Sequence, residues 1–329
     1  MNNYSNANLE TLKKDLDKTI EECKKLIEHL KTTPEVKLDH FNNIESMIYD
    51  LSGRVAFLGD VHPEENIRNF GNEADSKIQN FALEIFNDSN LYKKYNDIDI
   101  SNLDEEDLTF YKDLGLDFKD AGHELSKEKK ERLIEIEKKL IELGISFSEN
   151  IAKDKTELMF LEDELKGLTQ NELQNLRKEG DHFVITMAYP DVNAVSENCS
   201  VRKTREVVWK AFNNRSVKEN SPILEKAVVL RNEKAKLFGF NTWSEYRLQN
   251  RMAKGPSNVT SMYKDLIPKL QEAANKEKNE LVIDDIEIND IAPWDIRYFI
   301  STERAKVSNV ANSELKKYFY IHDVKNEMF

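Results

Sequence analysis

The stretch that does most to decide the fold is LSKEKKERLIEIEKKLIELGISFSENI, residues Leu125 to Ile151. Its apolar residues recur at every third or fourth position, which places them along one side of an α-helix. They are Leu133, Ile136, Leu140, Leu143, Phe147 and Ile151. Charged residues fill most of the positions between them. The spacing predicts a long amphipathic helix of about six turns or more, whose apolar side is covered by other parts of the chain.

The same period extends in both directions from this segment. Upstream it predicts helices over Leu9–Leu30, Phe41–Leu58, Ile67–Phe86 and Leu103–Leu114. Downstream it predicts helices over Arg202–Asn213, Ile223–Phe238, Trp243–Met252, Val259–Glu280 and Pro293–Val307. The period changes to two between Gly180 and Pro190, which is typical of a strand. The sequence therefore predicts a mainly α, irregular multi-helical fold with a small β element near 181–189.

The amino-acid composition indicates which kinds of partner and which cellular compartment to expect. Among 329 residues, Lys and Arg number 48 against 61 Asp and Glu, a net charge of -13. Nucleic-acid binding depends on a surplus of basic residues, so we expect no nucleic-acid partner. No apolar run approaches the ~18 residues of a membrane span, so we expect no membrane partner either. The two cysteines, Cys23 and Cys199, are too few for a disulfide framework. Cys23 lies on an apolar helical stripe and is expected in the core, and a reducing, cytoplasmic location fits best.

Motifs that carry chemistry are absent from the sequence. No glycine-rich phosphate loop and no Gly-x-Ser-x-Gly elbow occurs. The one His-Glu dipeptide is His123-Glu124, and the second ligand of a His-Glu-x-x-His zinc site would have to be Lys127, a cation. His123 is therefore interpreted as an exposed residue that flanks the long helix. Cys199 has no histidine close by in sequence to activate it. The residues alone predict no catalytic residue and no metal ligand.

Six motifs in the second half of the chain nevertheless form a recognisable series. They are ELKGL (Glu164–Leu168), MAYP (Met187–Pro190), TREVVWKAFNNR (Thr204–Arg215), LFGFNTWSEY (Leu237–Tyr246), MAK (Met252–Lys254) and WDIRYF (Trp294–Phe299). Taken in this order they resemble the thimet oligopeptidase family of zinc metallopeptidases. Phe299 stands where that family usually has a second tyrosine.

The resemblance implies a neurolysin-like body of two helical parts that flank a channel for short peptides. It implies a flexible tail over 1–8, an N-terminal helical domain over 9–190, and the incomplete start of the peptidase catalytic region over 191–329. Most motif residues are expected to be packing residues, while Arg297 and Tyr298 are candidates for lining the substrate channel. The zinc helix of the complete family protein lies downstream of these motifs. The resemblance thus assigns zinc to the complete protein, and no zinc ligand to this chain.

Three functional hypotheses follow. The first is that the chain is the truncated N-terminal portion of a zinc metalloendopeptidase, a protease that hydrolyses short peptides in peptide metabolism. Under this hypothesis the chain alone is inactive, and one expected partner is the missing C-terminal half supplied in trans. The second is a non-catalytic helical module that binds peptides or a partner protein. The third is a split enzyme whose second chain provides the zinc helix.

Overall fold

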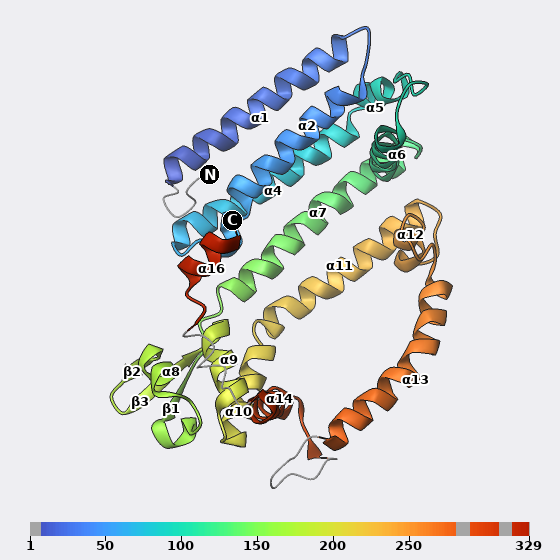
Figure 1. Cartoon of the computed structure of the whole chain (residues 1–329). Helices are drawn as coiled ribbons and strands as arrows, with labels where there is room; N and C mark the ends of the chain where they lie inside the picture. The colour runs from blue at the N-terminus through green and yellow to red at the C-terminus, as the bar shows by residue number, and fades with distance from the viewer. Residues whose placement is uncertain (1–7, 281–289, 309–317, 329) are drawn as a thin grey trace. The chain divides into compact units, whose positions relative to one another are not determined.

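Helices dominate the computed structural model, which describes residues 8–280, 290–308 and 318–328 (Figure 1). The mainly α prediction is confirmed. The first helices are α1 (Leu9–Thr32), α2 (Leu38–Leu51), α3 (Leu58–Val61), α4 (Glu65–Asn87), α5 (Ser89–Asn96), α6 (Glu105–Asp120) and α7 (Lys127–Ala152). They are followed by α8 (Gln170–Asn175), α9 (Tyr189–Asn198), α10 (Arg202–Asn213), α11 (Val217–Leu237), α12 (Trp243–Leu248), α13 (Pro256–Glu280), α14 (Pro293–Ser308) and α16 (Ile321–Met328).

The chain divides into two compact units, each made of two separate segments. Unit 1 comprises Met1–Ala152 and Lys218–Gly255, and unit 2 comprises Lys153–Val217 and Pro256–Phe329. The expected tail falls almost entirely on residues 1–7, which lie outside the described residues. The expected domain boundary at residue 190 stays a prediction.

Unit 1 is built from helices that bury the predicted apolar stripes. Asn8 caps α1 by accepting a hydrogen bond from the Glu10 N–H at 2.8 Å. Cys23 is 1% exposed in the core between α1 and its neighbours, as predicted. The single helix expected over Phe41–Leu58 is instead interrupted by a π-helical turn, η2 (Ser52–Ala56), before the short α3. A Cβ on Gly71 would lie 2.3 Å from the Gly59 nitrogen, so glycine permits the close contact of α3 with α4.

The long helix α7 forms as predicted and packs within unit 1. Leu133, Ile136 and Leu143 are buried. Polar contacts join α7 to α11: Arg132 Nε donates to Glu233 Oε1 at 2.7 Å, and Lys234 pairs with Glu137. The helix is therefore held on one side by the core and on another by ion pairs.

His123 does not lie exposed beside α7 as expected. Its ring stacks on Tyr92 with centroids 4.4 Å apart, and its Nε2 is 2.7 Å from the Phe86 carbonyl oxygen. Burial lowers the pKa of this imidazole. The exposed assignment was wrong because sequence position gives no information about the α5 ring that covers this residue.

Unit 2 contains an antiparallel sheet of β1 (Glu157–Leu161), β2 (Arg177–Glu179) and β3 (His182–Thr186) in the order β1-β3-β2. Leu158 is opposite Ile185, and Lys178 is opposite Phe183. The predicted strand is confirmed but ends at Thr186, because α9 begins at Tyr189 with Pro190 in its first turn. Strands β1 and β2 were not predicted. A second core lies between this sheet and the helices that follow it.

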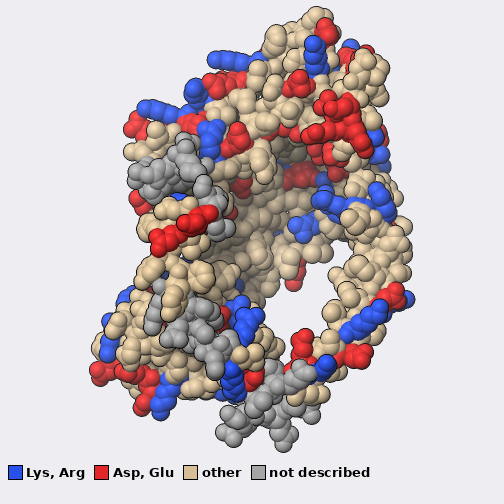
Figure 2. All heavy atoms as spheres, viewed as in Figure 1, with Lys and Arg blue, Asp and Glu red and all other residues tan. Residues whose placement is uncertain are grey.

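The surface is charged and mixed. On the face shown in Figure 2, basic and acidic side chains are interspersed. Within the described ranges, none of the helices combines the length and the apolar character needed to cross a bilayer. Helix α13 exposes a series of large apolar side chains; they are Met262, Tyr263, Leu266, Ile267 and Leu270.

Candidate functional site

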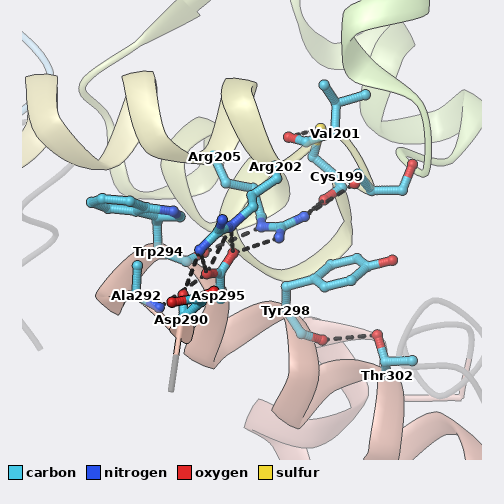
Figure 3. A network of polar contacts seen from close by, with 11 residues as sticks. Cys199, Val201, Arg202, Arg205, Asp290, Ala292, Trp294, Asp295, Tyr298 and Thr302 are labelled. Carbon is cyan, nitrogen blue, oxygen red and sulfur yellow. Dashed lines mark hydrogen bonds and ion pairs between the residues drawn. The ribbon is translucent and has the colours of Figure 1, made fainter. Parts of the chain in front are cut away.

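Three helices of unit 2 meet where two of the recognised motifs come together. Helices α9, α10 and α14 contact one another in pairs. Arg202 and Arg205 are three residues apart on α10, so both point from the same side of that helix. Asp295 lies in the first turn of α14 and faces them (Figure 3). We call Arg202, Arg205 and Asp295 the arginine cluster.

The Asp295 carboxylate is the centre of this cluster. It accepts hydrogen bonds from Arg205 Nη2 at 2.7 Å and from Arg202 Nη2 at 2.8 Å. It also accepts from the Ala292 N–H at 3.0 Å, which ties down the start of α14. The side chains of Asp295 and Arg205 are 0% and 2% exposed, whereas that of Arg202 is 42% exposed. Burial alone would raise the pKa of Asp295, but the hydrogen bonds from Arg202, Arg205 and the Ala292 N–H, together with the charge of Arg202, outweigh it and hold that pKa below its usual range.

All three nitrogen atoms of the Arg205 guanidinium group donate hydrogen bonds. Its Nη1 donates to the Cys199 carbonyl oxygen at 2.8 Å, and its Nε donates to the Trp294 carbonyl oxygen at 3.2 Å. Its guanidinium carbon lies 4.2 Å from the centroid of the Tyr298 ring, a cation–π contact. One side chain thus joins the end of α9 to the first turns of α14, and it fixes the position of Tyr298.

Tyr298 lines a shallow pocket of about 430 Å³ in unit 2. The other lining residues come from the end of α9 and from α14; they are Glu197, Asn198, Ser301, Thr302, Ala305 and Lys306. The Tyr298 hydroxyl points away from the arginine cluster in Figure 3. Thr302 Oγ1 donates to the Tyr298 carbonyl oxygen at 2.8 Å. The lining of the pocket therefore includes the aromatic ring of Tyr298, the acidic Glu197 and the basic Lys306, whose Nζ pairs with Glu303 at 2.9 Å.

Arg297, the other predicted channel residue, lies elsewhere on α14. Its side chain is exposed and donates to Asn193 Oδ1 of α9. It is not among the residues that line the Tyr298 pocket. The structure thus does not bring the two candidates into one pocket, and a role for either in a substrate channel stays a prediction.

The described residues do not fit a zinc ion. A protein zinc site needs three or four His, Cys or carboxylate ligands around one point. Over 8–280, 290–308 and 318–328, no group of three such side chains is placed to hold a metal. Cys199 is buried, its Sγ lies 3.4 Å from the Glu164 carbonyl oxygen, and burial raises the pKa of its thiol. This thiol is a packing group and lacks the lowered pKa of a reactive cysteine.

Sequence reasoning missed the pairing of Arg205 with Asp295. Both residues lie in motifs that were singled out, TREVVWKAFNNR and WDIRYF, and they have opposite charges. They are 90 positions apart. Each motif also contains other charged residues, including Glu206 and Lys210 in the first and Arg297 in the second, so the sequence alone did not show which two would pair.

Comparison with known proteins identifies what the chain is similar to. Residues 195–329 match the model of peptidase family M3. The chain is 31% identical over 280 residues to a thimet-like oligopeptidase of Dictyostelium discoideum, covering 77% of this chain and 42% of that protein. It is 26% identical over 306 residues to saccharolysin of Saccharomyces cerevisiae, covering 86% of this chain and 43% of that one. It is 25% identical over 354 aligned positions to oligopeptidase A of Haemophilus influenzae, covering 99% of this chain and 52% of that protein. The chain spans about half the length, or less, of these relatives.

Proposed function

Since the chain belongs to the thimet oligopeptidase family, within peptidase family M3, we propose that it is the N-terminal part of a zinc metalloendopeptidase that hydrolyses short peptides. The observation that carries the proposal is the 31% identity to the thimet-like oligopeptidase over 77% of this chain. Zinc is the metal of this family and would polarise the water that attacks the peptide bond. In this proposal the zinc ligands belong to polypeptide other than the described residues.

In this proposal the chain holds helix α14 in position and contributes to binding the peptide substrate. The arginine cluster fixes α14 against α9 and α10, and α14 presents Tyr298 at a pocket. A phenol can donate one hydrogen bond and accept others, which suits a peptide backbone. We therefore retain Tyr298 as a candidate substrate contact. Arg297, held by Asn193, is retained as a second candidate at the exposed edge of the same helix.

The proposal includes a partner and a location. The partner is the C-terminal half of the family fold, either continuous with this chain or supplied in trans. The location is cytoplasmic, which is supported by two thiols that are both free and buried. The alternative is a non-catalytic helical module that binds a peptide or a protein.

The test begins with the nucleotide sequence after codon 329. Both the present chain and the product of any longer reading frame, or a co-expressed second chain, are then assayed with a quenched fluorescent peptide and for bound zinc. We expect no turnover and no stoichiometric zinc with residues 1–329, and chelator-sensitive turnover once a His-Glu-x-x-His segment is present. If no such segment can be found, or if a complete protein carrying it cleaves no peptide, the peptidase proposal fails.

Tyr298 can be tested in the same complete protein. Tyr298→Phe removes one hydroxyl and keeps the ring against Arg205, so a backbone contact would appear as a severalfold higher KM with little change in kcat. Ser301→Ala is a matched control, because it removes one hydroxyl from the same pocket. Equal kinetics for Tyr298→Phe and the parent would remove Tyr298 from the substrate site.

A further inference from the structure

Unit 1 contains a groove that the proposed peptidase function does not use. Its volume is about 790 Å³, within the usual range of ligand sites. Three elements line it: the segment from α2 through η2 to α3, helix α4, and helix α7. On α7 the lining runs from Leu140 to Ser148, about 12 Å along the helix axis. That length matches about four residues of an extended chain.

Two glycines keep the groove wide. Gly53 and Gly144 both line it, and each lies inside a helical segment, where glycine is disfavoured. A Cβ built on either of them meets nothing within 4 Å. By contrast, Gly59 and Gly71 in the same unit are required by close packing. Packing therefore does not explain Gly53 and Gly144, whereas access to the groove does. Gly53 also belongs to η2, and π-helical turns of this kind are frequent at functional sites.

The lining favours an extended peptide over a helix. Helix α4 presents Asn72, Asp75 and Gln79 at spacings of three and four, so polar side chains follow one face of that helix. Gln79 Nε2 donates to Asp75 Oδ2 at 2.6 Å, which leaves the Gln79 Oε1 and the second Asp75 oxygen for a ligand. An extended peptide has free backbone N–H and C=O groups that side-chain amides can pair, whereas a helix pairs its own. The α7 wall carries the aliphatic side chains of Leu140, Ile141 and Ile145, which suit the apolar side chains of such a peptide. The α2–α3 wall adds the rings of Tyr49 and Phe57, which are 82% and 55% exposed.

The charge of the groove selects for a basic residue. Asp60 and Asp75 line it, and no Lys or Arg does so among the described residues. The cations on the adjacent helical turns are already paired: Arg54 Nη1 is 2.6 Å from Asp15 Oδ2, and Lys77 Nζ is 2.6 Å from Asp17 Oδ1. Asp60 lies one turn from Phe57. A lysine or arginine could therefore place its charged end at Asp60 and its alkyl stem along the Phe57 ring.

We propose that this groove binds an extended polypeptide segment of about four residues that contains a lysine or arginine. The site lies wholly in unit 1 and does not depend on zinc or on the peptidase function proposed above. Binding is therefore measurable with residues 1–329 alone.

The test is fluorescence anisotropy with two labelled peptides that carry C-terminal amides, Gly-Ala-Leu-Lys-Leu-Ala and the same peptide with Glu in place of Lys. We expect saturable binding of the Lys peptide and at least tenfold weaker binding of the Glu peptide. Asp60→Asn should weaken binding of the Lys peptide about tenfold and reduce the preference for Lys over Glu.

A steric variant tests the location. Gly144→Leu extends a side chain into the open space of the groove while favouring the α7 helix, so the fold is retained and binding of the Lys peptide should fall at least tenfold. Lys138→Leu adds a leucine at an exposed α7 position outside the lining and should bind like the parent. Circular dichroism verifies that both variants are folded. The proposal is overturned by absence of saturable binding, by equal binding of the two peptides, or by equal effects of the two leucine variants. It is also overturned by a dimer of this chain that Gly144→Leu dissociates, because a second copy would then fill the groove.

Discussion

Replacing Asp295 by asparagine is expected to destabilise unit 2 by about 3 kcal/mol. The substitution keeps the size of the side chain but removes the negative charge at the centre of the arginine cluster. Arg205 is 2% exposed, so its charge would remain buried without a counter-ion. Removing one partner of a buried pair costs about 3–5 kcal/mol. The lower end applies because Arg205 retains the carbonyl oxygens of Cys199 and Trp294, and because the half-exposed Arg202 pair contributes at most about 1 kcal/mol.

The assay must report unit 2 alone, since two units need not unfold together. Trp209 and Trp294 both lie in unit 2, with ring centroids 5.8 Å apart, whereas Trp243 lies in unit 1. In a Trp243→Phe background, tryptophan emission during urea unfolding therefore follows unit 2. With a urea dependence of about 1–3 kcal/mol per M, the midpoint for Asp295→Asn should fall by about 1–3 M.

Two comparisons make this result interpretable. Asp163→Asn removes a carboxylate from an exposed ion pair with Lys166 in the same unit and should leave the midpoint unchanged. Lowering the pH should also destabilise the parent. Because the folded pKa of Asp295 is depressed, its contribution is complete above the unfolded value near ~3.9 and is lost as the pH falls through the lower folded value. Asp295→Asn should lack that component. A midpoint for Asp295→Asn within error of Asp163→Asn would refute the conclusion that the buried Arg205–Asp295 pair stabilises unit 2.

Three further outcomes are expected. Burial, with the Asp117 carboxylate as a second cause, raises the pKa of Glu45 to about 7. The contribution of Glu45 to stability is therefore complete below its pKa in the unfolded chain and is lost as the pH rises through 7. Glu45→Gln should raise the Tm of unit 1, measured by calorimetry, at pH 8 and leave it unchanged at pH 4. Gly239 follows α11 with φ +84, so Gly239→Ala should cost about 1 kcal/mol or more in urea unfolding, and no change would contradict the left-handed turn. Exposed Leu266 and Leu270 on α13 should bind a hydrophobic dye and promote self-association. The double variant Leu266→Glu, Leu270→Glu should reduce dye fluorescence and the associated fraction in sedimentation. Unchanged values would show that α13 is not the surface through which the chain associates.

The helices could be predicted because their signal is local. The three- and four-residue period of α1 and α7 reports directly on which side is buried, and α10 has the predicted bounds, Arg202–Asn213. Strand β2 gave no comparable signal, since Arg177, Lys178 and Glu179 are all exposed and form a strand only by pairing with β3. The π-helical turn at Ser52–Ala56 could not be predicted either, because the apolar period continues across it as it would in an uninterrupted α-helix.

The candidate sites depended on contacts that no local pattern records. Tyr298 was singled out by resemblance, but its support by Arg205 joins residues far apart in the chain. The same is true of the groove in unit 1, where Gly53 and Gly144 line one space although 91 positions separate them. Sequence reasoning gave the parts of these sites, and only the fold showed which parts meet.

The interleaved segments of the two units have a consequence for synthesis on the ribosome. Unit 1 is incomplete until Lys218–Gly255 has been translated, although its first segment ends at Ala152. At about 5–20 residues per second, the side of α7 that pairs with α11 waits roughly 5–20 s for its partner. During that interval Arg132 and Glu137 lack their ion-pair partners Glu233 and Lys234. The first segment of unit 2 is also synthesised before either unit has all of its residues and can complete its fold. The nascent chain should therefore be a substrate for ribosome-associated chaperones until Gly255 has left the exit tunnel.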